Sequence, residues 1–311
     1  MNDIAVQTRD LSMIYGETTA LYPLDLDIKD NELFGLIGPD GAGKTSLFRI
    51  LVTLLIPSKG KASVLGLDTV KQYKEIRKNI GYMPGRFSLY IDLSVEENLG
   101  FYADAFGTSI KENYHLIKDI YSQIEPFRKR RVGALSGGMK QKLALSCALI
   151  HNPDILFLDE PTTGVDAVSR KEFWGMLKNL KQKGKTIVVS TPYMDEASLC
   201  DRIALIQGGK VMQTESPENI RKSFQFPLYS VYTDNIYKMM LDIRKFNKTH
   251  DIQLFGHEAH FTPGEPEFSP GELDQFLRKH HHENIKISAI EPGIEDCFME
   301  LMHKKEAHET H

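Results

Sequence analysis

One glycine-rich turn carries a lysine and two hydroxyl side chains at a spacing that suits anion binding. It follows an apolar, strand-like run, 33–37, precedes an apolar-periodic run, 47–52, and reads Gly38-Pro39-Asp40-Gly41-Ala42-Gly43-Lys44-Thr45-Ser46. Glycines let backbone N–H groups approach an anion closely, and the start of the next helix adds further N–H groups. The stretch predicts a phosphate-binding loop in which Lys44 reaches the β- and γ-phosphates of a nucleoside triphosphate and the Thr45 hydroxyl holds Mg²⁺.

An acidic pair ends a second apolar run. Residues 155–158 are all apolar and predict a buried parallel strand, and Asp159 and Glu160 follow directly. Ligands bind at this end of the strands in such sheets. We therefore predict that Asp159 holds Mg²⁺ through water and that Glu160 is the general base toward the attacking water. The alternatives are a purely structural acidic pair and an ordinary glycine turn at Lys44, and the presence of both motifs in one chain favours the nucleotide site.

A third motif, Leu135-Ser136-Gly137-Gly138-Met139, opens a helix that we expect to end at Ile150. Ser136 is a candidate N-cap, and the two glycines leave the first N–H groups of the helix uncovered. Those groups make a second candidate anion site. Taken alone, the motif is equally consistent with a capped core helix whose glycines permit close packing.

The elements around these motifs alternate between strands and helices. We expect strands at Ile4–Thr8, Leu24–Ile28, 62–65, 80–83 and 186–190, with Ser12 to Gly16 lying between the first two. A capping box at Ser94 predicts a helix to about Phe106, and helical periodicity continues from Ser109 to Phe127. The sequence thus predicts an α/β fold with a mainly helical insertion.

Together with Gly164-Val165-Asp166, these motifs resemble the ATP-binding cassette of ABC transporters over about residues 4–221. The Leu135 to Met139 signature is the specific part, because P-loops alone occur in many NTPase families. The resemblance implies a P-loop NTPase with a mixed sheet core and a helical subdomain at about 88–150, within a nucleotide-binding domain of residues 1–224. It also implies ATP and Mg²⁺ as ligands.

In this family two cassettes pack head to tail, and each ATP lies between one phosphate loop and the other cassette's signature. The resemblance therefore implies that the signature, residues 135–139, faces a partner's ATP and that Asp166 lies at the cassette interface. It makes Tyr15 the expected adenine-stacking residue. It also places three residues near the surface that meets the membrane subunit: Phe87, Leu89 and Tyr90.

Two positions depart from the family pattern. Gly85 stands where the family has a glutamine whose amide contacts Mg²⁺ and links the site to the membrane subunit. Pro192 stands where the family has a histidine that contacts the γ-phosphate and the attacking water, and proline offers neither a side-chain hydrogen bond nor an N–H. Losing one such group costs about 2.7–4 kcal/mol of transition-state stabilisation. We hypothesise that this chain hydrolyses ATP slowly at its own loop.

In this hypothesis the intact signature completes a competent site on a different cassette. The first cassette of tandem drug-export ATPases is similar, including Met139-Lys140-Gln141. That similarity suggests a heterodimer that energises export of a drug or other small amphipathic substrate through ABC-2 type transmembrane permease subunits. The alternative is a fully active homodimer in which Arg86 or Tyr193 compensates.

A non-transport ABC ATPase of translation or DNA repair is the alternative from another class. The net charge of −4 and the absence of a basic linker disfavour a nucleic-acid partner. The sequence has no signal-peptide pattern and no run that could span a bilayer. We therefore expect a cytoplasmic protein, held peripherally at the membrane by its permease subunits. The cysteines are expected to be reduced core thiols: Cys147, Cys200 and Cys297.

After Phe226-Pro227 the composition changes, and strand and helix patterns follow in the order β-α-β-β-α-β-α. This order predicts a small α+β, ferredoxin-like domain over residues 225–305, followed by a flexible tail, 306–311. Ser269 to Glu272 predicts another capping box. Several histidines could bind metal, although solvated helix-end residues are the simpler interpretation: His280, His281, His282, His303, His308 and His311.

Overall fold

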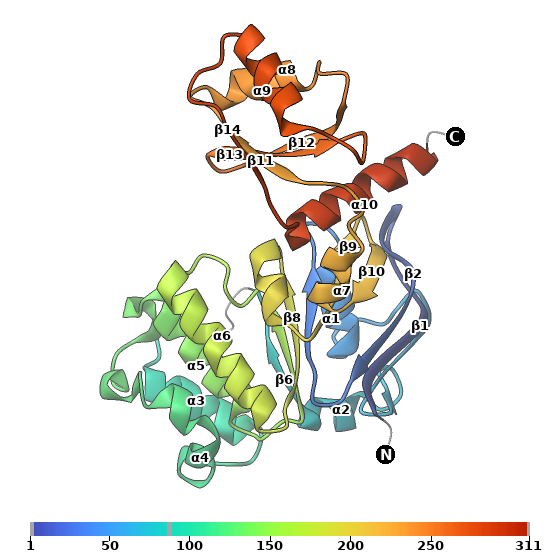
Figure 1. Ribbon diagram of the computed structural model, residues 1–311. Helices are drawn as coiled ribbons and strands as arrows, with labels where there is room; N and C mark the ends of the chain where they lie inside the picture. The colour runs from blue at the N-terminus through green and yellow to red at the C-terminus, as the bar shows by residue number, and fades with distance from the viewer. Residues whose placement is uncertain (1–2, 86–88, 310–311) are drawn as a thin grey trace. The chain divides into compact units, whose positions relative to one another are not determined.

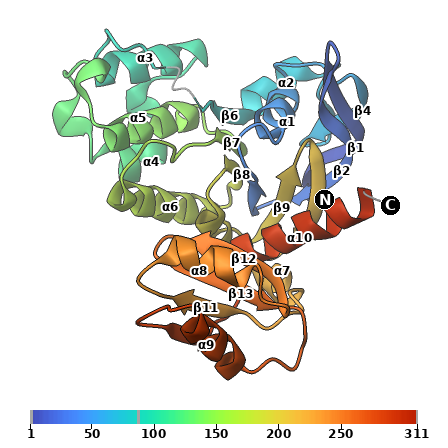
Figure 2. The same ribbon diagram turned by 90° about the horizontal axis from the view of Figure 1, so that it is seen from above.

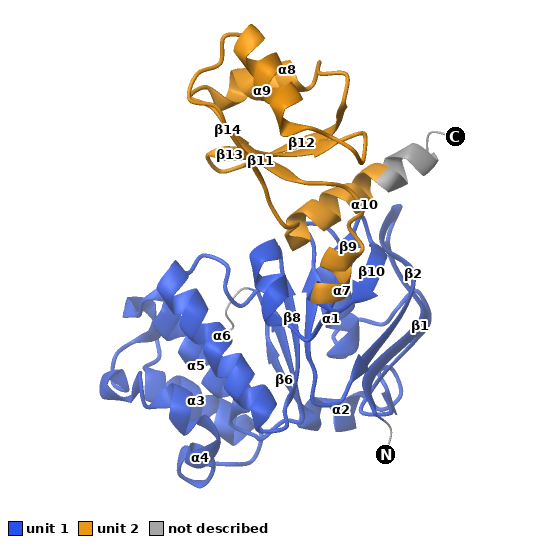
Figure 3. Ribbon diagram, in the orientation of Figure 1, with its two compact units in different colours: residues 1–217 blue, residues 218–311 orange. Residues whose placement is uncertain are grey.

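The computed structural model describes residues 3–85 and 89–309, which divide into two compact units. Unit 1 runs to Pro217 and unit 2 begins at Glu218, so the boundary lies upstream of the predicted residue 224 (Figure 3). Each unit has its own hydrophobic core. Within the described residues, no helix combines the length and apolar character needed to cross a membrane.

Two sheets form the described part of unit 1. A smaller antiparallel sheet has the order β2-β1-β4-β5, with β1 (Ile4–Tyr15), β2 (Thr18–Lys29), β4 (Lys59–Val64) and β5 (Leu67–Asp68). The larger sheet is parallel except for its edge strand β10. Its order is β10 (Lys210–Glu215), β9 (Arg202–Gln207), β3 (Leu33–Ile37), β8 (Thr186–Thr191), β7 (Ile155–Asp159) and β6 (Ile80–Met83).

The helices of unit 1 fall into two groups. In both views α3, α4 and α5 gather toward the β6 edge of the larger sheet, on the opposite side from β1 and β2 (Figures 1 and 2). This group is α3 (Val95–Ala105), α4 (Ile110–Tyr121) and α5 (Gly137–Leu149), with 3₁₀ turns η1 (Glu125–Phe127) and η2 (Val132–Ala134). The others are α1 (Lys44–Leu51), α2 (Tyr73–Asn79), α6 (Ala167–Gln182) and η3 (Met194–Leu199).

The helical insertion agrees with the prediction except at one end. We expected helical periodicity as far as Phe127, but α4 ends at Tyr121 and a separate 3₁₀ turn follows. Pro126 lies in the first turn of that element, where it has no N–H for an i→i−4 hydrogen bond and its ring clashes with the preceding turn, so an α-helix cannot continue through it.

The first hairpin is longer than its residue pattern suggested. We placed residues 12–16 between two short strands, whereas β1 continues to Tyr15 and turns at Gly16 into β2. Register shifts interrupt the β1–β2 pairing, and Asp10 has a positive φ of 49°. Such irregularities break the alternation of apolar and polar residues, which explains why the pattern stopped early.

Three neighbouring strands of the larger sheet carry the functional positions. Every residue of β3, β7 and β8 is buried, as expected for a parallel sheet covered on both faces. Because β8 pairs with β3 on one side and β7 on the other, the carboxyl ends of all three strands meet at one edge. That edge holds Ile37, Asp159 and Thr191.

Unit 2 contains a four-stranded antiparallel sheet with the order β12-β13-β11-β14. Since β11 and β12 both run antiparallel to β13 between them, the sheet is a split β-α-β arrangement. The element order agrees with the predicted α+β domain: β11 (Tyr229–Tyr232), α8 (Ile236–Ile243), β12 (Thr249–Phe255), β13 (Glu258–Pro263), α9 (Pro270–Lys279), β14 (Lys286–Ala289) and α10 (Ile294–Glu309). The short helix α7 (Pro217–Lys222) precedes them.

One local prediction in unit 2 is wrong. The Ser269 side chain makes no capping hydrogen bond, so the predicted capping box is absent, although α9 does begin there. Pro270 in the first turn already fixes a helical φ and leaves no N–H to satisfy. The flexible tail at residues 306–311 stays a prediction; α10 runs from Ile294 to Glu309. Residues 310 and 311 lie outside the described part of the chain.

The three cysteines and His282 are packed inside the protein. All three cysteines are free and buried, as predicted, and burial raises the pKa of the Cys297 thiol to about 12. His282 is buried rather than solvated, with Nε2 3.0 Å from Asp242 Oδ2. Among the residues that the structure describes, no three His, Cys, Asp or Glu side chains are grouped to hold a metal ion.

Candidate nucleotide-binding site

The glycine-rich turn connects β3 to α1 and wraps around its own lysine. Lys44 Nζ donates hydrogen bonds to the carbonyl oxygens of Gly38 at 2.8 Å and Pro39 at 2.9 Å. A Cβ at Gly38 would collide with the backbone of Ile206, whereas a Cβ at Gly41 would meet no atom within 4 Å. The loop therefore packs tightly against β9 at its start and opens to free space at its centre.

The phosphate loop and the acidic strand end form one site. Lys44 Nζ lies 3.2 Å from Glu160 Oε1, and the two side chains are only 3% and 23% exposed. Residues that the sequence supplied from stretches more than a hundred positions apart thus meet in an ion pair. A buried ammonium group requires such a partner, because desolvating an unpaired charge is costly.

Glu160 has an unusual backbone conformation. Its φ of 50° lies in the left-handed region, which costs energy for a residue with a Cβ. Its N–H donates to both the carbonyl oxygen and the Oγ of Ser190, each at 3.0 Å. These bonds to β8 hold the turn that directs the Glu160 carboxylate toward Lys44.

Ser190 and Thr191 connect the two motifs, although neither belongs to the motifs that the sequence revealed. Ser190 Oγ donates to Asp159 Oδ1 at 2.5 Å, and the Thr191 carbonyl accepts from Gly38 N–H at 3.3 Å. Both residues are fully buried. They join the phosphate loop to the acidic pair because β8 lies between the two strands, and only the polar end of an otherwise apolar run marked them in the sequence.

Tyr15, the expected adenine-stacking residue, lies beside the phosphate loop. Its hydroxyl is 3.3 Å from Ser46 Oγ, and the residue is 42% exposed. The end of the antiparallel hairpin therefore presents an aromatic ring near the start of α1. An exposed ring in this position suits a stacked base.

These residues fit a triphosphate and Mg²⁺. Among the residues that the structure describes, no atom fills the space over Gly41, no side chain caps the start of α1, and Lys44 pairs with one carboxylate. Thr45 and Asp159 supply hydroxyl and carboxylate oxygens, the ligand types that Mg²⁺ prefers. Bound Mg²⁺ would neutralise phosphate charge.

The signature motif caps its helix and packs it closely, as in one of the two interpretations that the sequence left open, and the anion-binding role stays a prediction. Ser136 caps α5, its Oγ accepting from Met139 N–H at 3.3 Å. Gly138 is a packing glycine, because a Cβ there would lie 2.6 Å from Ser169 Oγ in α6. Gly137 is exposed and has room for a Cβ, so the helix start stays accessible. Leu135 is buried beneath it.

The signature helix contacts the loop after the acidic pair rather than the phosphate loop. Gln141 donates a hydrogen bond to the Pro161 carbonyl, and a Cβ on Gly137 would lie 3.7 Å from the Gly164 carbonyl oxygen. Asp166 caps α6, accepting from Val168 and Ser169 N–H at 3.1 and 3.0 Å. The backbone hydrogen bond from Ser169 lowers the Asp166 pKa.

The two departures lie at the site. A Cβ on Gly85 would be 3.2 Å from the Asp159 carbonyl oxygen, so residue 85 adjoins the acidic strand end. Pro192 follows Thr191 directly, and the ring of Tyr193, one of the proposed compensating residues, lies 4.4 Å below the Arg170 guanidinium. Arg86, the other, lies outside the described residues.

The three residues expected to face the membrane subunit differ in their exposure. Phe87 lies outside the described part of the chain, Leu89 is buried, and Tyr90 is 48% exposed.

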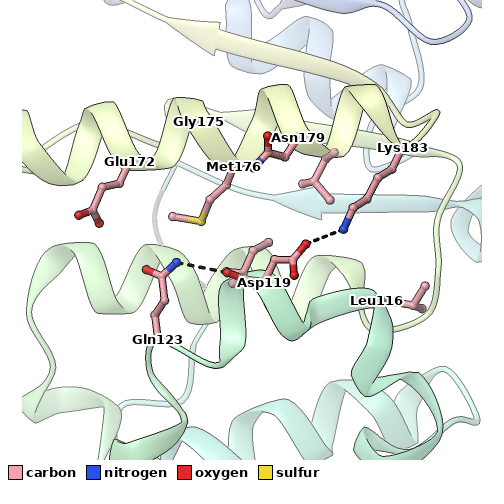
Figure 4. A pocket seen from close by; sticks show the side chains of 10 residues that line it. Leu116, Asp119, Gln123, Glu172, Gly175, Met176, Asn179 and Lys183 are labelled. Carbon is pink, nitrogen blue, oxygen red and sulfur yellow. Dashed lines mark hydrogen bonds and ion pairs between the residues drawn. The ribbon is translucent and has the colours of Figure 1, made fainter.

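A separate hollow of about 350 Å³ lies between α4 and α6 and contains no predicted site residue (Figure 4). Its polar rim is closed by Lys183 and Asp119, whose Nζ and Oδ2 are 2.6 Å apart.

Comparison with known proteins assigns the family. Residues 21–163 match the family model described as ABC transporter. Nod factor export ATP-binding protein I of Rhizobium leguminosarum bv. viciae is 32% identical over 305 residues, covering 97% of this chain and 96% of that protein. The "Probable multidrug ABC transporter ATP-binding protein YbhF" of Escherichia coli (strain K12) is 38% identical over 221 residues, 70% of this chain, which spans only 38% of that protein's length.

Solved structures agree. The ATP-binding cassette MJ0796, a dimer in a post-hydrolysis state bound to ADP and Pi, matches with a TM-score of 0.62 and 28% identity, over 68% of this chain and 98% of that one. The structure of cbiO1 from Clostridium perfringens matches with a TM-score of 0.64 and 25% identity, over 71% of this chain and 92% of that one. The chain has the phosphate loop, the acidic strand end and the signature, and it matches one relative over nearly its full length. It therefore belongs to the ATP-binding proteins of ABC transporters.

Proposed function

We propose that this chain is the ATP-binding and ATP-hydrolysing subunit of an ABC exporter. The observation that carries the proposal is the buried ion pair of Lys44 and Glu160, formed where the phosphate loop meets the acidic strand end. The names of the relatives, a multidrug transporter protein and a Nod factor export protein, support export as the process.

The residues suggest how the reaction is prepared. Lys44 forms an ion pair with the Glu160 carboxylate. Phosphates bound in the loop would draw the ammonium group toward themselves and free Glu160 to accept a proton from water. Mg²⁺, held by Thr45 and by Asp159, would stabilise the charge that develops on the transferred phosphoryl group.

We further propose that this site is the weaker half of a heterodimer. Gly85 adjoins Asp159 and offers no amide, and Pro192 offers no donor at the end of β8. The capped signature helix remains available to complete the site of a second cassette, with Asp166 at the interface. A fully active homodimer is the alternative, and Tyr193, which packs under Arg170, is poorly placed to substitute for a histidine.

The proposed membrane partner is a pair of ABC-2 type permease subunits, which would hold the protein at the cytoplasmic face. A groove of about 370 Å³ in unit 1 supports this role, because its lining is mostly apolar and partly exposed. Leu54 and Phe106 on its walls are 54% and 42% exposed, and an apolar segment of a permease would cover them. The lining is Val52, Leu54, Arg77, Ile80, Tyr82, Tyr102, Phe106, Cys147, Ala148 and His151.

ATP binding and steady-state ATP hydrolysis, measured on the full chain, test these proposals. Lys44→Ala is expected to lose ATP binding, and the wild-type chain alone is expected to hydrolyse ATP slowly. Adding the cassette that co-purifies from the native membrane should restore brisk hydrolysis. Brisk hydrolysis by the chain alone would reject the heterodimer, and co-purification with ribosomes or DNA instead of a polytopic membrane protein would reject transport.

A further inference from the structure

A buried carboxylate links three elements behind the nucleotide site. Glu196, in η3, is 1% exposed. Its Oε2 accepts hydrogen bonds from Thr191 Oγ1 at 2.6 Å and Thr162 Oγ1 at 3.1 Å. Thr191 ends β8, and Thr162 lies two residues after Glu160. One carboxylate therefore ties the end of β8 to the loop that follows the general base.

Arg170 of α6 neutralises this carboxylate. Its Nε lies 3.2 Å from Glu196 Oε1 and its Nη2 2.9 Å from Asp195 Oδ2, while the guanidinium covers the Tyr193 ring. A planar guanidinium can serve two acids and a ring at once, which an ammonium group cannot. One turn earlier in the same helix, Asp166 accepts the Arg170 N–H through its carbonyl at 2.9 Å.

The chain of contacts reaches the reacting groups through Thr191. The carbonyl of Thr191 accepts from Gly38 in the phosphate loop, and the adjacent Ser190 holds Asp159 and the backbone of Glu160. Thr191 is thus bonded on one side to the nucleotide site and on the other to Glu196. Glu196 contacts Thr191 directly, and Arg170 contacts Glu196.

We propose that Arg170 and Glu196 are positioning residues, which fix the end of β8 to helix α6 and thereby hold the nucleotide site in register with the Asp166 loop. Pro192 makes the arrangement necessary, because it contributes neither an N–H nor a polar side chain. The segment is held instead by Tyr193 N–H, which donates to Thr191 Oγ1 at 3.1 Å, and by the Arg170 stack. The inference rests on ATP hydrolysis at this site.

The test compares Arg170→Ala and Glu196→Gln with Lys171→Ala, an exposed neighbour on α6, in the full-length chain. Bound radiolabelled ATP is titrated to count sites, and its hydrolysis is then followed in a single turnover. Both variants are expected to keep the site count and an ATP Kd within about twofold, because neither side chain touches the phosphate loop. Their rate per bound ATP is expected to fall about 10–100-fold, since small displacements of reacting groups have effects of that size. Lys171→Ala is expected to match wild type.

The readout separates positioning from support of the fold. A purely structural role would lower the number of ATP sites or the Tm and leave the rate per bound ATP unchanged, and that result overturns the inference. If Arg170→Ala fails to fold, Tyr193→Leu, which removes only the ring stack, is expected to show the same loss of rate. If wild type binds ATP without hydrolysing it, the proposed turnover fails instead. ATP-driven association measured by light scattering then tests the inference, and weakening by Arg170→Ala but not by Lys171→Ala supports it; equal association overturns it.

Discussion

The ammonium group of Lys44 shows how single residues define the nucleotide site. It is almost fully buried, and its partners are two loop carbonyls and the Glu160 carboxylate. The lysine therefore helps to fix the conformation of the loop through its own contacts. By the same reasoning, residues that lack functional groups at this edge, Gly85 and Pro192, limit the chemistry that the site can perform.

Restoring one missing group is expected to raise the hydrolysis rate. Pro192→His returns a donor to the end of β8, and a single positioned donor is worth about 10²–10³ in rate at a transition state. The measurement is ATP turnover of the isolated chain, compared at saturating ATP. Gly85→Gln is expected to gain less, because its Cβ would press against the Asp159 carbonyl oxygen at 3.2 Å. Unchanged turnover in Pro192→His would contradict the account of a weakened site.

At the scale of elements, two helix starts with the same sequence signal differ in structure. The Ser94 capping box is complete: Glu97 N–H donates to Ser94 Oγ at 3.2 Å, and Ser94 N–H donates to Glu97 Oε2 at 2.8 Å. Ser269 makes no such bond. Ser94→Ala is expected to lower the free energy of unfolding by about 1 kcal/mol, and Ser269→Ala by less than about 0.5 kcal/mol. Urea unfolding of both variants measures the difference, and equal losses would argue against it.

His151, just after α5, makes the stability of unit 1 depend on pH. Its ring stacks on Phe106 at 3.7 Å and Nε2 bonds the Ile80 carbonyl at 2.9 Å, while burial lowers its pKa below the ordinary value. The folded chain therefore favours the neutral ring. The unfolded chain binds a proton below about pH 6.5, so stability is complete above that pH and is lost as the pH falls through this range.

The variant His151→Gln removes this titration. Between pH 7.5 and 5.5 the wild-type chain is expected to lose up to about 1 kcal/mol more stability than the variant. Urea unfolding at both pH values provides the comparison. If the two proteins lose stability equally, the ring does not resist protonation in the folded state.

At the scale of the whole molecule, the two units have cores that share no residue. We expect two unfolding transitions that respond to different changes. ATP at 100 times its Kd stabilises its binding unit by about 2.7 kcal/mol, which should raise only the unit 1 transition. Phe261→Ala, in the centre of the unit 2 core, is expected to lower only the other transition, by about 3–5 kcal/mol.

Differential scanning calorimetry with and without nucleotide resolves the two transitions. Phe48→Ala, equally buried in the unit 1 core, is the matched control and should reverse the pattern. A single transition that moves as one with every change would show that the units unfold together.

Features that depend on a few neighbouring residues could be predicted from residue order alone. The phosphate loop, the cap at Ser136 and the buried strand before Asp159 could all be predicted, because residue type and spacing fix local geometry. The same local reasoning erred where an irregularity intervened, as in the bulged hairpin that reaches Tyr15 and at Ser269.

Which of these features lie next to one another depends on the order and packing of the strands. Placing β8 between β3 and β7 makes Ser190 and Thr191 the connection between the phosphate loop and the acidic pair, and it brings Lys44 to Glu160. The close packing of Gly138 on Ser169 likewise explains a glycine that the motif left ambiguous. These contacts join residues far apart in the chain, and their partners are selected by strand order and packing, which no short window of sequence contains.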